Sequence, residues 1–424
     1  MANNLESNIT KKLAKGFMTA FESGRVLSKN INTQLLSNAF NPGTGDTVYF
    51  KRPTDFKSVE TLTGDLTGST ESDIIVGQAS GKAQPYISVH AKYSEFEESL
   101  ELDDLSAILA PAATRIVTTL ELNCTKFMMN NSGLLAGSPG NVVTTWDHLA
   151  EAGAVMAASG VPRDDTWFCA VNPHTQTKLA SDQRSLGAGG VAAGDIDRAN
   201  KMAVINENFA GMKVMTSSTL ASFETPATGD LVGTVNGAPA ATYVAAKDTM
   251  TQAITIAGIG AFSGVIPAGT IVQVAGRNRL NLSTRRPIID GIGANRLFTA
   301  VVTADATIAG GAGTLIVSGP GIYEANGAYN TIDSAIADGD VITILNADST
   351  LFQPNLFWHK QAFSIGSIPI KKLYATDTVA TTADGLQLRV CKYSDGKTNT
   401  QMVRFDLHPA FAVLNPFFAG HAYG

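Results

Sequence analysis

The stretch from residue 224 to residue 352 decides the fold, because TIVQVA (270–275) and LFTAVVT (297–303) are two of six short β-branched runs in it. The other four are LVGTV (231–235), AITI (253–256), TLIVS (314–318) and VITIL (341–345). Gly, Asn and Asp separate the runs, and no convincing helical period lies between them. Six strands at this spacing predict a small antiparallel barrel or sandwich.

The sequence on both sides of this stretch has a mixed pattern. Trp167–Val171 is predicted to be a buried strand, and Asn172-Pro173 after it supplies a helix cap and a first-turn proline. A helix is predicted over about Trp146–Ala158, with Thr145 as its candidate N-cap. Strand-like runs return near the C-terminus as LQLRVCKY (386–393) and TQMVRFDL (400–407). The β-rich stretch is therefore predicted to be an insertion in an α+β chain.

The first forty residues predict an arm. Apolar residues recur there at four-residue spacing and form one face of a short amphipathic helix: Leu5, Ile9, Leu13, Phe17 and Phe21. Asn41-Pro42-Gly43 separates this helix from the body of the chain. Two interpretations stay open, a helix packed on its own domain and a mobile segment that docks on a neighbour. On the second, these five residues are candidate arm contacts.

A long loop follows the first predicted strand. The run DTVYFKR (46–52) is predicted to be a strand that Pro53 ends, and apolar alternation predicts a second strand after Pro85. Some thirty residues between them are rich in Thr, Ser, Gly and Asp. Compact domains rarely contain a loop of this length unless it is functional. We therefore expect a β-hairpin that projects from the body over about residues 54–85.

The next segment predicts a long helix. Six acidic residues fall within 95–104, and they span a predicted strand end and a helix start, which disfavours a convergent metal site. Asp103 and Asp104 are better explained as residues at the positive end of a helix dipole. Pro111 is predicted to open the helix, and its buried stripe comprises Ile116, Leu120, Cys124 and Phe127.

Composition and charge exclude several classes of protein. Of 424 residues, 44% are hydrophobic and 16% are charged, so much of the surface must be uncharged. The net charge of −6 provides no excess of Lys and Arg to neutralise phosphates, so the chain is not expected to grip DNA, although it could enclose it. Three widely spaced cysteines indicate a reducing compartment rather than a disulfide framework. No secretory signal and no membrane segment are expected.

Catalytic motifs are missing from the sequence. We find no GxSxG, GxxxxGK[ST] or HExxH motif, and the six histidines are scattered singly. Cys169 and His174 could suggest a nucleophile pair, but Cys169 lies in a predicted buried strand, and we regard it as core. No enzyme activity, cofactor or metal is expected.

Several stretches, in this order along the chain, resemble the major coat proteins of tailed double-stranded DNA bacteriophages, which have the Hong Kong 97-type fold. The stretches are GDTVYFKRP (45–53), YSEFEESLELDDLSAILAPAATRIVTTLE (93–121), AVNPHTQTKLAS (170–181), FAGMKVMTSSTL (209–220) and NLFWHKQAFSIGSIPI (355–370). The chain looks most like the short-tailed enterobacterial phage subgroup, whose coat protein has an insertion domain. A Shigella phage is the expected source.

The resemblance implies a division into domains. An N-terminal arm would cover 1–42 and an extended loop 54–85. A peripheral domain with the spine helix would cover 43–53 and 86–135, plus a returning strand at about 385–405. An axial domain would cover 136–223, 353–384 and 406–424, and the insertion domain 224–352. Founding-type phages cross-link subunits through a Lys and an Asn. Nothing marks Lys57 or Lys82 as activated, so we expect no cross-linking here.

The function implied is structural. Copies of the chain would assemble as hexamers and pentamers into an icosahedral shell around the phage genome. By resemblance, a scaffolding protein and a portal are partners, and assembly takes place in the cytoplasm of the host bacterium before the protein resides in the virion. The alternative function is that of a secreted or surface β-rich adhesin or decoration protein, although such a protein should show a signal and repeats.

One basic loop in the β-rich stretch is a candidate contact between subunits. Five arginines fall within twenty residues: Arg277, Arg279, Arg285, Arg286 and Arg296. Guanidinium groups bind carboxylates bidentately, and the acidic stretch Asp333–Asp340 of another copy is a possible partner. The alternative is a solvated loop whose charges aid solubility.

Overall fold

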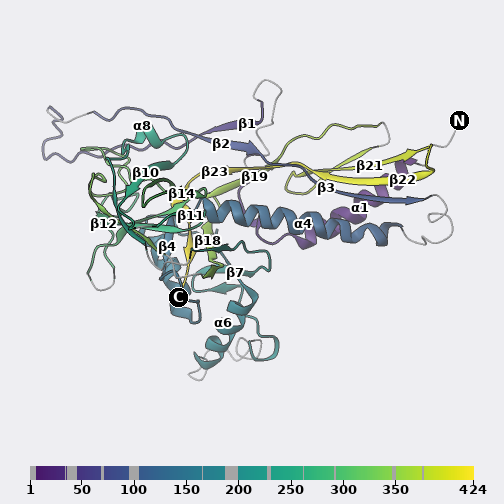
Figure 1. Ribbon diagram of the computed structural model, residues 1–424, viewed down its shortest axis with the longest axis horizontal. Helices are drawn as coiled ribbons and strands as arrows, with labels where there is room; N and C mark the ends of the chain where they lie inside the picture. The colour runs from purple at the N-terminus through teal and green to yellow at the C-terminus, as the bar shows by residue number, and fades with distance from the viewer. Residues whose placement is uncertain are drawn as a thin grey trace. The chain divides into compact units, whose positions relative to one another are not determined.

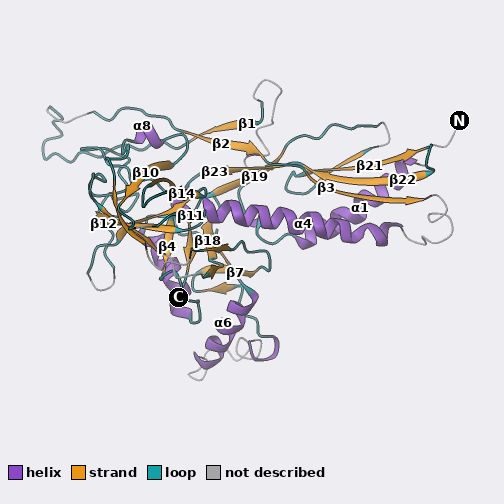
Figure 2. Ribbon diagram, viewed as in Figure 1, coloured by secondary structure: helices purple, strands orange, loops and turns teal. Residues whose placement is uncertain are grey.

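The computed structural model describes residues 6–33, 35, 45–67, 71–94, 105–164, 166–186, 199–226, 231–260, 262–290, 293–345, 350–374 and 377–424. The chain divides into two compact units. The first combines Met1–Tyr49, Ser80–Thr125 and Phe363–Ala412, and the second combines Phe50–Ala79, Lys126–Ala362 and Val413–Gly424. Helices and strands are both abundant, so the α+β class is confirmed (Figure 2).

The first unit contains a long antiparallel sheet. Its order is β20 (Thr378–Thr381), β21 (Gln387–Asp395), β22 (Thr400–Leu407) and β3 (Ile87–Ser94), and Figure 1 shows the last three as long strands that run together. Helix α1 (Glu6–Gly24) packs against β20 and β21. The predicted strand after Pro85 and both predicted C-terminal strands are therefore confirmed.

The predicted pairing of the projecting hairpin is wrong. Strand β1 (Thr47–Lys51) lies beside β2 (Gln78–Ala83) in a sheet of order β1, β2, β23 (Pro409–Val413) and β19 (Phe363–Ser367), whereas β3 pairs with β22. The sequence QASGKA of β2 has no β-branched residue, so the strand pattern did not reveal it. Pro85 has no N–H to donate to a ladder, and the chain changes sheets there.

Helix α4 (Leu105–Asn130) is longer than predicted, because Pro111 lies inside it and does not open it. A proline within a helix removes one backbone hydrogen bond and costs about 3 kcal/mol. Here the helix continues through the proline from the preceding run LSAILA, which contains good helix formers. Ile116, Leu120 and Cys124 are buried as predicted, and Phe127 is half-buried. The acidic run 95–104 lies outside the described residues.

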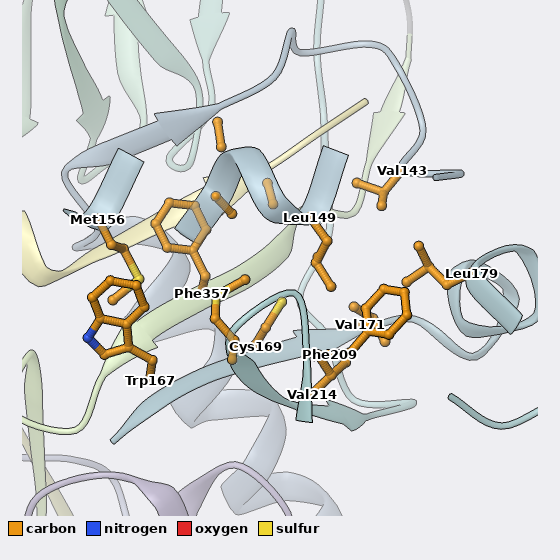
Figure 3. Close-up of a cluster of buried hydrophobic side chains, with 14 of the residues drawn as sticks. Val143, Leu149, Met156, Trp167, Cys169, Val171, Leu179, Phe209, Val214 and Phe357 are labelled. Carbon is orange, nitrogen blue, oxygen red and sulfur yellow. The ribbon is translucent and has the colours of Figure 1, made fainter. Parts of the chain in front are cut away.

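The second unit contains a mixed six-stranded sheet. Its order is β4 (Leu134–Ala136), β24 (Ala419–Ala422), β18 (Asn355–His359), β5 (Trp167–Val171), β7 (Met212–Thr216) and β6 (Asn208–Phe209). Every residue of β5 is buried, as predicted. Figure 3 shows Leu149 and Met156 of helix α5 (Trp146–Ala158) pointing toward Cys169 and Phe357 of the sheet. The sheet and this helix thus enclose one apolar core.

The two predicted helices of this unit begin at the predicted residues, with different caps. Helix α6 (Pro173–Leu186) begins with Pro173, and the Asn172 Oδ1 atom accepts the backbone N–H of His174 at 2.8 Å, as a helix cap does. Thr145 occupies the cap position of α5, but its side chain makes no cap hydrogen bond. The Asp182 carboxylate accepts the N–H of Trp146 at 2.7 Å instead.

The β-rich stretch forms a closed six-stranded barrel, also in the second unit. The six predicted runs become its strands: β9 (Leu231–Val235), β10 (Thr251–Ala257), β12 (Ile271–Asn278), β13 (Leu297–Val302), β15 (Gly313–Ser318) and β16 (Val341–Leu345). All six pairings are antiparallel, which confirms the predicted barrel. Alternate residues such as Ile254, Ile256 and Phe298 fill its interior.

Smaller elements complete this region. Strands β11 (Gly264–Ile266) and β14 (Ala306–Ile308) form a two-stranded sheet, and α8 (Tyr243–Ala246) is a one-turn helix. Strand β8 (Phe223–Glu224) pairs with β17 (Leu351–Phe352), with Phe352 opposite Phe223. The chain segments that enter and leave the β-rich stretch are therefore paired with each other.

Candidate assembly surfaces

The loop between β1 and β2 presents apolar side chains to solvent. It has no helix or strand in its described residues. Six large apolar side chains are exposed on it, Leu62 fully and Ile74 by 74%: Phe56, Val59, Leu62, Leu66, Ile74 and Val76. Concentrations of exposed apolar side chains mark surfaces that bind other proteins. The arrangement suits a loop that is buried against another protein surface.

The predicted basic loop is not a free basic surface. Arg277 forms a bidentate pair with Asp340 of the same chain, with both N–O distances at 2.7 Å, and donates to Ser334 at 2.8 Å. Asp333 of the same acidic stretch accepts hydrogen bonds from Asn278. Asp333 and Asp340 thus have partners in their own chain, and a contact of this stretch with another copy stays a prediction. A partner 63 residues away in the chain could not be identified from local pattern.

Two of the arginines connect the barrel to the six-stranded sheet. The guanidinium of Arg279 is buried, donates to the carbonyls of Gly133 at 2.9 Å and Thr299 at 3.1 Å, and lies over the Phe417 ring. Burial, and then the positive charge of Arg296, lower the pKa of Arg279 to about 9. Arg296 donates to the carbonyl of Leu135 at 2.9 Å. Both side chains thus stabilise the contact between the barrel and the sheet within their own chain.

The remaining two arginines differ from each other. Arg285 pairs with Asp55 and donates to the carbonyl of Asn330 at 2.8 Å. Arg286 is exposed and, within the described residues, is the one member of the five whose side chain has no partner in this chain. A contact with another subunit therefore stays a prediction for Arg286, with the solvated-loop alternative still open.

The described part of the arm helix packs on its own unit. Phe17 and Phe21 are buried, and the Phe17 ring stacks on Phe405 of β22 with centroids 4.6 Å apart. For these two side chains the first interpretation, a helix packed on its own domain, is the one observed. Leu5 and the side chains of Ile9 and Leu13 lie outside the described residues, so the role of these three residues as arm contacts stays a prediction.

The helix end is fixed by a buried polar cluster. The Glu121 carboxylate of α4 accepts the backbone N–H groups of Leu27 at 2.8 Å and Ser28 at 3.1 Å. Arg25, whose side chain is fully buried, donates to Asp384 at 2.8 Å. Buried charges are stable in proteins when they are paired in this way. No local sequence pattern indicates this cluster, because its members are separated by up to 359 residues.

In the part of the chain that the structure describes, Cys169 and His174 do not form a nucleophile pair, and no group is arranged to bind a metal ion. Cys169 is fully buried, and burial raises its pKa to about 12, so its thiol is not a nucleophile at neutral pH, while His174 is exposed. Among the described residues, no cluster of three or more His, Cys, Asp or Glu could hold a metal ion. In the described ranges, no helix is long and apolar enough to cross a membrane.

Comparisons with known proteins identify the family. A sequence model described as "P22 coat protein - gene protein 5" matches residues 1–423. The major capsid protein of Acyrthosiphon pisum secondary endosymbiont phage 1 is 36% identical over 428 residues, which cover 100% of both chains.

Two solved phage structures are similar to this chain at lower sequence identity. A chain from Mycobacterium phage Che8 has a TM-score of 0.48 and 11% identity, over 94% of this chain and 90% of that chain. The capsid of cyanophage P-SCSP1u has a TM-score of 0.46 and 10% identity, over 94% of this chain and 88% of that chain.

The family model and this relative both match nearly all of the chain and not one segment of it. The chain therefore belongs to the P22 coat protein family, and its function is that of a phage major capsid protein, which forms the shell of the virion and is not an enzyme.

Proposed function

We propose that copies of this chain assemble as hexamers and pentamers into an icosahedral shell that encloses a double-stranded DNA genome. The observation that carries the proposal is the exposed apolar loop between β1 and β2. Covering these side chains with a neighbouring copy stabilises the assembled state by roughly 25 cal/mol for each Å² of apolar surface removed from water. A shell repeats each such contact many times.

One chain in a closed shell must occupy non-equivalent positions. The proposed division of labour assigns rigidity to the sheets and the barrel, and adjustment to the arm and the loop. The proposed domains are those of the Hong Kong 97-type fold, with residues 224–352 as the insertion domain. The pairing of β8 with β17 supports the insertion, because it brings the two ends of that stretch together.

The proposed relation to DNA is enclosure without specific binding. The net charge of −6 supports this, since phosphate contacts need an excess of Lys and Arg. A scaffolding protein, a portal and assembly in the host cytoplasm belong to the same proposal, as does membership of the short-tailed enterobacterial subgroup with a Shigella host. The absence of covalent cross-linking through Lys57 or Lys82 is also proposed.

Electron microscopy of the expressed chain tests the proposal. We expect closed shells from the natural sequence and unassembled subunits from Leu62→Asp, because a charge at the fully exposed loop residue opposes burial. Val142→Asp is the matched control, since Val142 is also largely exposed but lies outside the loop. Fibres or stable monomers from the natural sequence would contradict the proposed icosahedral shell. Shells from Leu62→Asp would remove the loop from the assembly contacts.

A further inference from the structure

A single hydroxyl group joins the two limbs of the loop between β1 and β2. The backbone N–H of Asp55, on the outgoing limb, donates to Tyr329 Oη at 3.0 Å. The same Oη donates to the carbonyl of Ile75, on the returning limb, at 3.2 Å. Tyr329 belongs to the β-rich region, 254 residues from Ile75. This region therefore holds both limbs at one point.

The Tyr329 ring is itself supported by apolar packing. It stacks on the ring of Tyr243 with centroids 3.7 Å apart and an angle of 2° between the planes. Tyr243 is buried together with Ala246 and Ile322, and Ile75 of the loop packs against this cluster. Aromatic stacking of this kind adds to the free energy of burial. The hydroxyl is thus presented by a rigid base.

Polar contacts flank the hydroxyl on both limbs. Arg285 pairs with Asp55, and the Lys57 ammonium donates to Asn326 Oδ1 at 3.1 Å. On the returning side, the backbone N–H of Gln78 donates to the Asp248 carboxylate at 3.2 Å. We call Tyr329, Arg285, Asn326 and Asp248 the clamp. Each of its members contacts a residue between 55 and 78.

The returning limb approaches the β-rich region too closely for any side chain at residue 77. A Cβ atom on Gly77 would lie 2.7 Å from the Lys247 carbonyl oxygen and 3.0 Å from Tyr243 Oη. The first neighbour is backbone and cannot rotate away. Glycine is required here by the close approach, and not by a turn.

Backbone strain is found at the same place. Arg285 and Met250 have φ angles of +52° and +51°. These lie in the left-handed region that residues other than Gly and Asn seldom adopt. Arg285 belongs to the clamp, and Met250 packs against the Tyr243 cluster. Strained residues persist where the surrounding structure determines them, and they are common at functional sites.

We propose that Tyr329 is a positioning residue for shell assembly. The β-rich region clamps the root of the loop in its own subunit and so sets the direction in which the exposed side chains between 56 and 66 meet a neighbouring copy. The β-rich region then influences assembly through its hold on the loop. This inference rests on the proposed assembly role of the loop.

Hydrogen exchange and assembly rate, measured on the full chain, test the clamp. Tyr329→Phe keeps the stacked ring and removes both hydrogen bonds to the loop. We expect the Asp55 amide to exchange about tenfold faster, the loss of roughly one hydrogen bond, and assembly to slow or to give aberrant particles. The melting temperature should stay unchanged, because the barrel core is untouched. Tyr323→Phe is the matched control, since the Tyr323 hydroxyl makes no described contact with the loop.

Charge exchange separates positioning from general stability. Asp55→Arg and Arg285→Asp should each slow assembly, and the double variant should restore the rate, because it restores the pair in the opposite sense. A merely structural role would not produce this rescue. Gly77→Ala provides a second route, with Gly396→Ala as control because a Cβ there meets nothing within 4 Å.

Two results would overturn the clamp. One is unchanged exchange at Asp55 in Tyr329→Phe, which would show that the hydroxyl does not hold the loop. The other is faster exchange with normal assembly, which would show that the position of the loop root is unimportant. If the natural sequence forms no shells, the proposed function fails, and the exchange measurement still decides whether the clamp exists.

Discussion

Apolar side chains are buried in the barrel and exposed in the loop that the clamp holds. In the barrel, Ile254 and Phe298 are completely buried among side chains of the other strands. In the loop, Leu62 and Ile74 are exposed to water. The apolar side chains of the barrel interior are therefore buried within one chain, whereas those of the loop can be buried only against a second protein surface. The residues that stabilise the fold and those proposed for assembly thus lie in different parts of one unit. Substitutions can therefore change one property without the other.

The largest expected effect on stability is in the barrel. Phe298→Ala leaves a cavity at a completely buried position and should lower the free energy of unfolding by about 3–5 kcal/mol. Urea denaturation measures this. Val232→Ala on the exposed face of β9 is the control and should change it by less than about 0.5 kcal/mol. Equal effects of the two substitutions would show that the barrel interior is not the stability core.

A smaller effect is expected when the barrel is cut from its surroundings. Ile271 and Val301 of the barrel pack against Leu135 and Tyr423, and Arg279 donates to Gly133, so a fragment of residues 224–352 loses these contacts. We expect a β-type circular dichroism spectrum and a cooperative melt, with stability lower by about 2 kcal/mol than in the full chain. A random-coil spectrum would mean that the barrel depends on the sheet to fold.

The Arg277–Asp340 pair should make barrel stability depend on pH. Burial alone would raise the pKa of Asp340, but hydrogen bonds from Arg277 and from the Ala337 N–H, with the charge of Arg277, lower it below its usual value. A carboxyl with a lowered pKa stabilises the folded state above the unfolded pKa of about 3.9. This contribution, about 1 kcal/mol, should be lost as pH falls through the folded pKa. Asp340→Asn should remove that part of the dependence in melts between about pH 5 and pH 2.

The smallest effect on stability is expected in the loop. Leu62→Asp replaces a fully exposed side chain and should change the free energy of unfolding by less than about 0.5 kcal/mol. Its effect on assembly should nevertheless be the largest of all four changes. Calorimetry on the unassembled subunit, beside light scattering during assembly, measures both quantities. A strongly destabilised subunit would contradict the contrast between loop and barrel.

Local pattern predicted the elements whose residues carry a clear signal. All six barrel strands were predicted from β-branched runs, and α5 and β5 have the predicted bounds. That the six runs form one small antiparallel domain was predictable for the same reason, but their order around the closed barrel, β10, β15, β13, β12, β16 and β9, was not. Two elements were not predicted correctly from local pattern. Strand β2 contains no β-branched residue to indicate a strand. Pro111 suggested a helix start, but the preceding residues extend helix α4 beyond it.

The candidate sites were less predictable than the fold. The sequence offered five arginines as candidate contacts between subunits, whereas four of them have partners within this chain. A guanidinium group has the same sequence signature whether it binds a neighbour in its own fold or another copy. Phe17 and Phe21 were likewise recognised as one apolar face, while the surface that covers them, including Phe405, is almost four hundred residues away.

The sequence by itself determined the alternation of apolar residues and the Asn172 cap of α6, because each depends on neighbours within a few residues, and its composition determined the net charge. Tertiary structure alone decided which strands pair, which carboxylate each arginine meets and which apolar side chains stay in water. These depend on long-range closure of the chain, as in the contact between Tyr329 and both limbs of the loop. Burial and pairing are properties of position in space, and residues with the same local pattern acquire them only when the fold brings their partners to them.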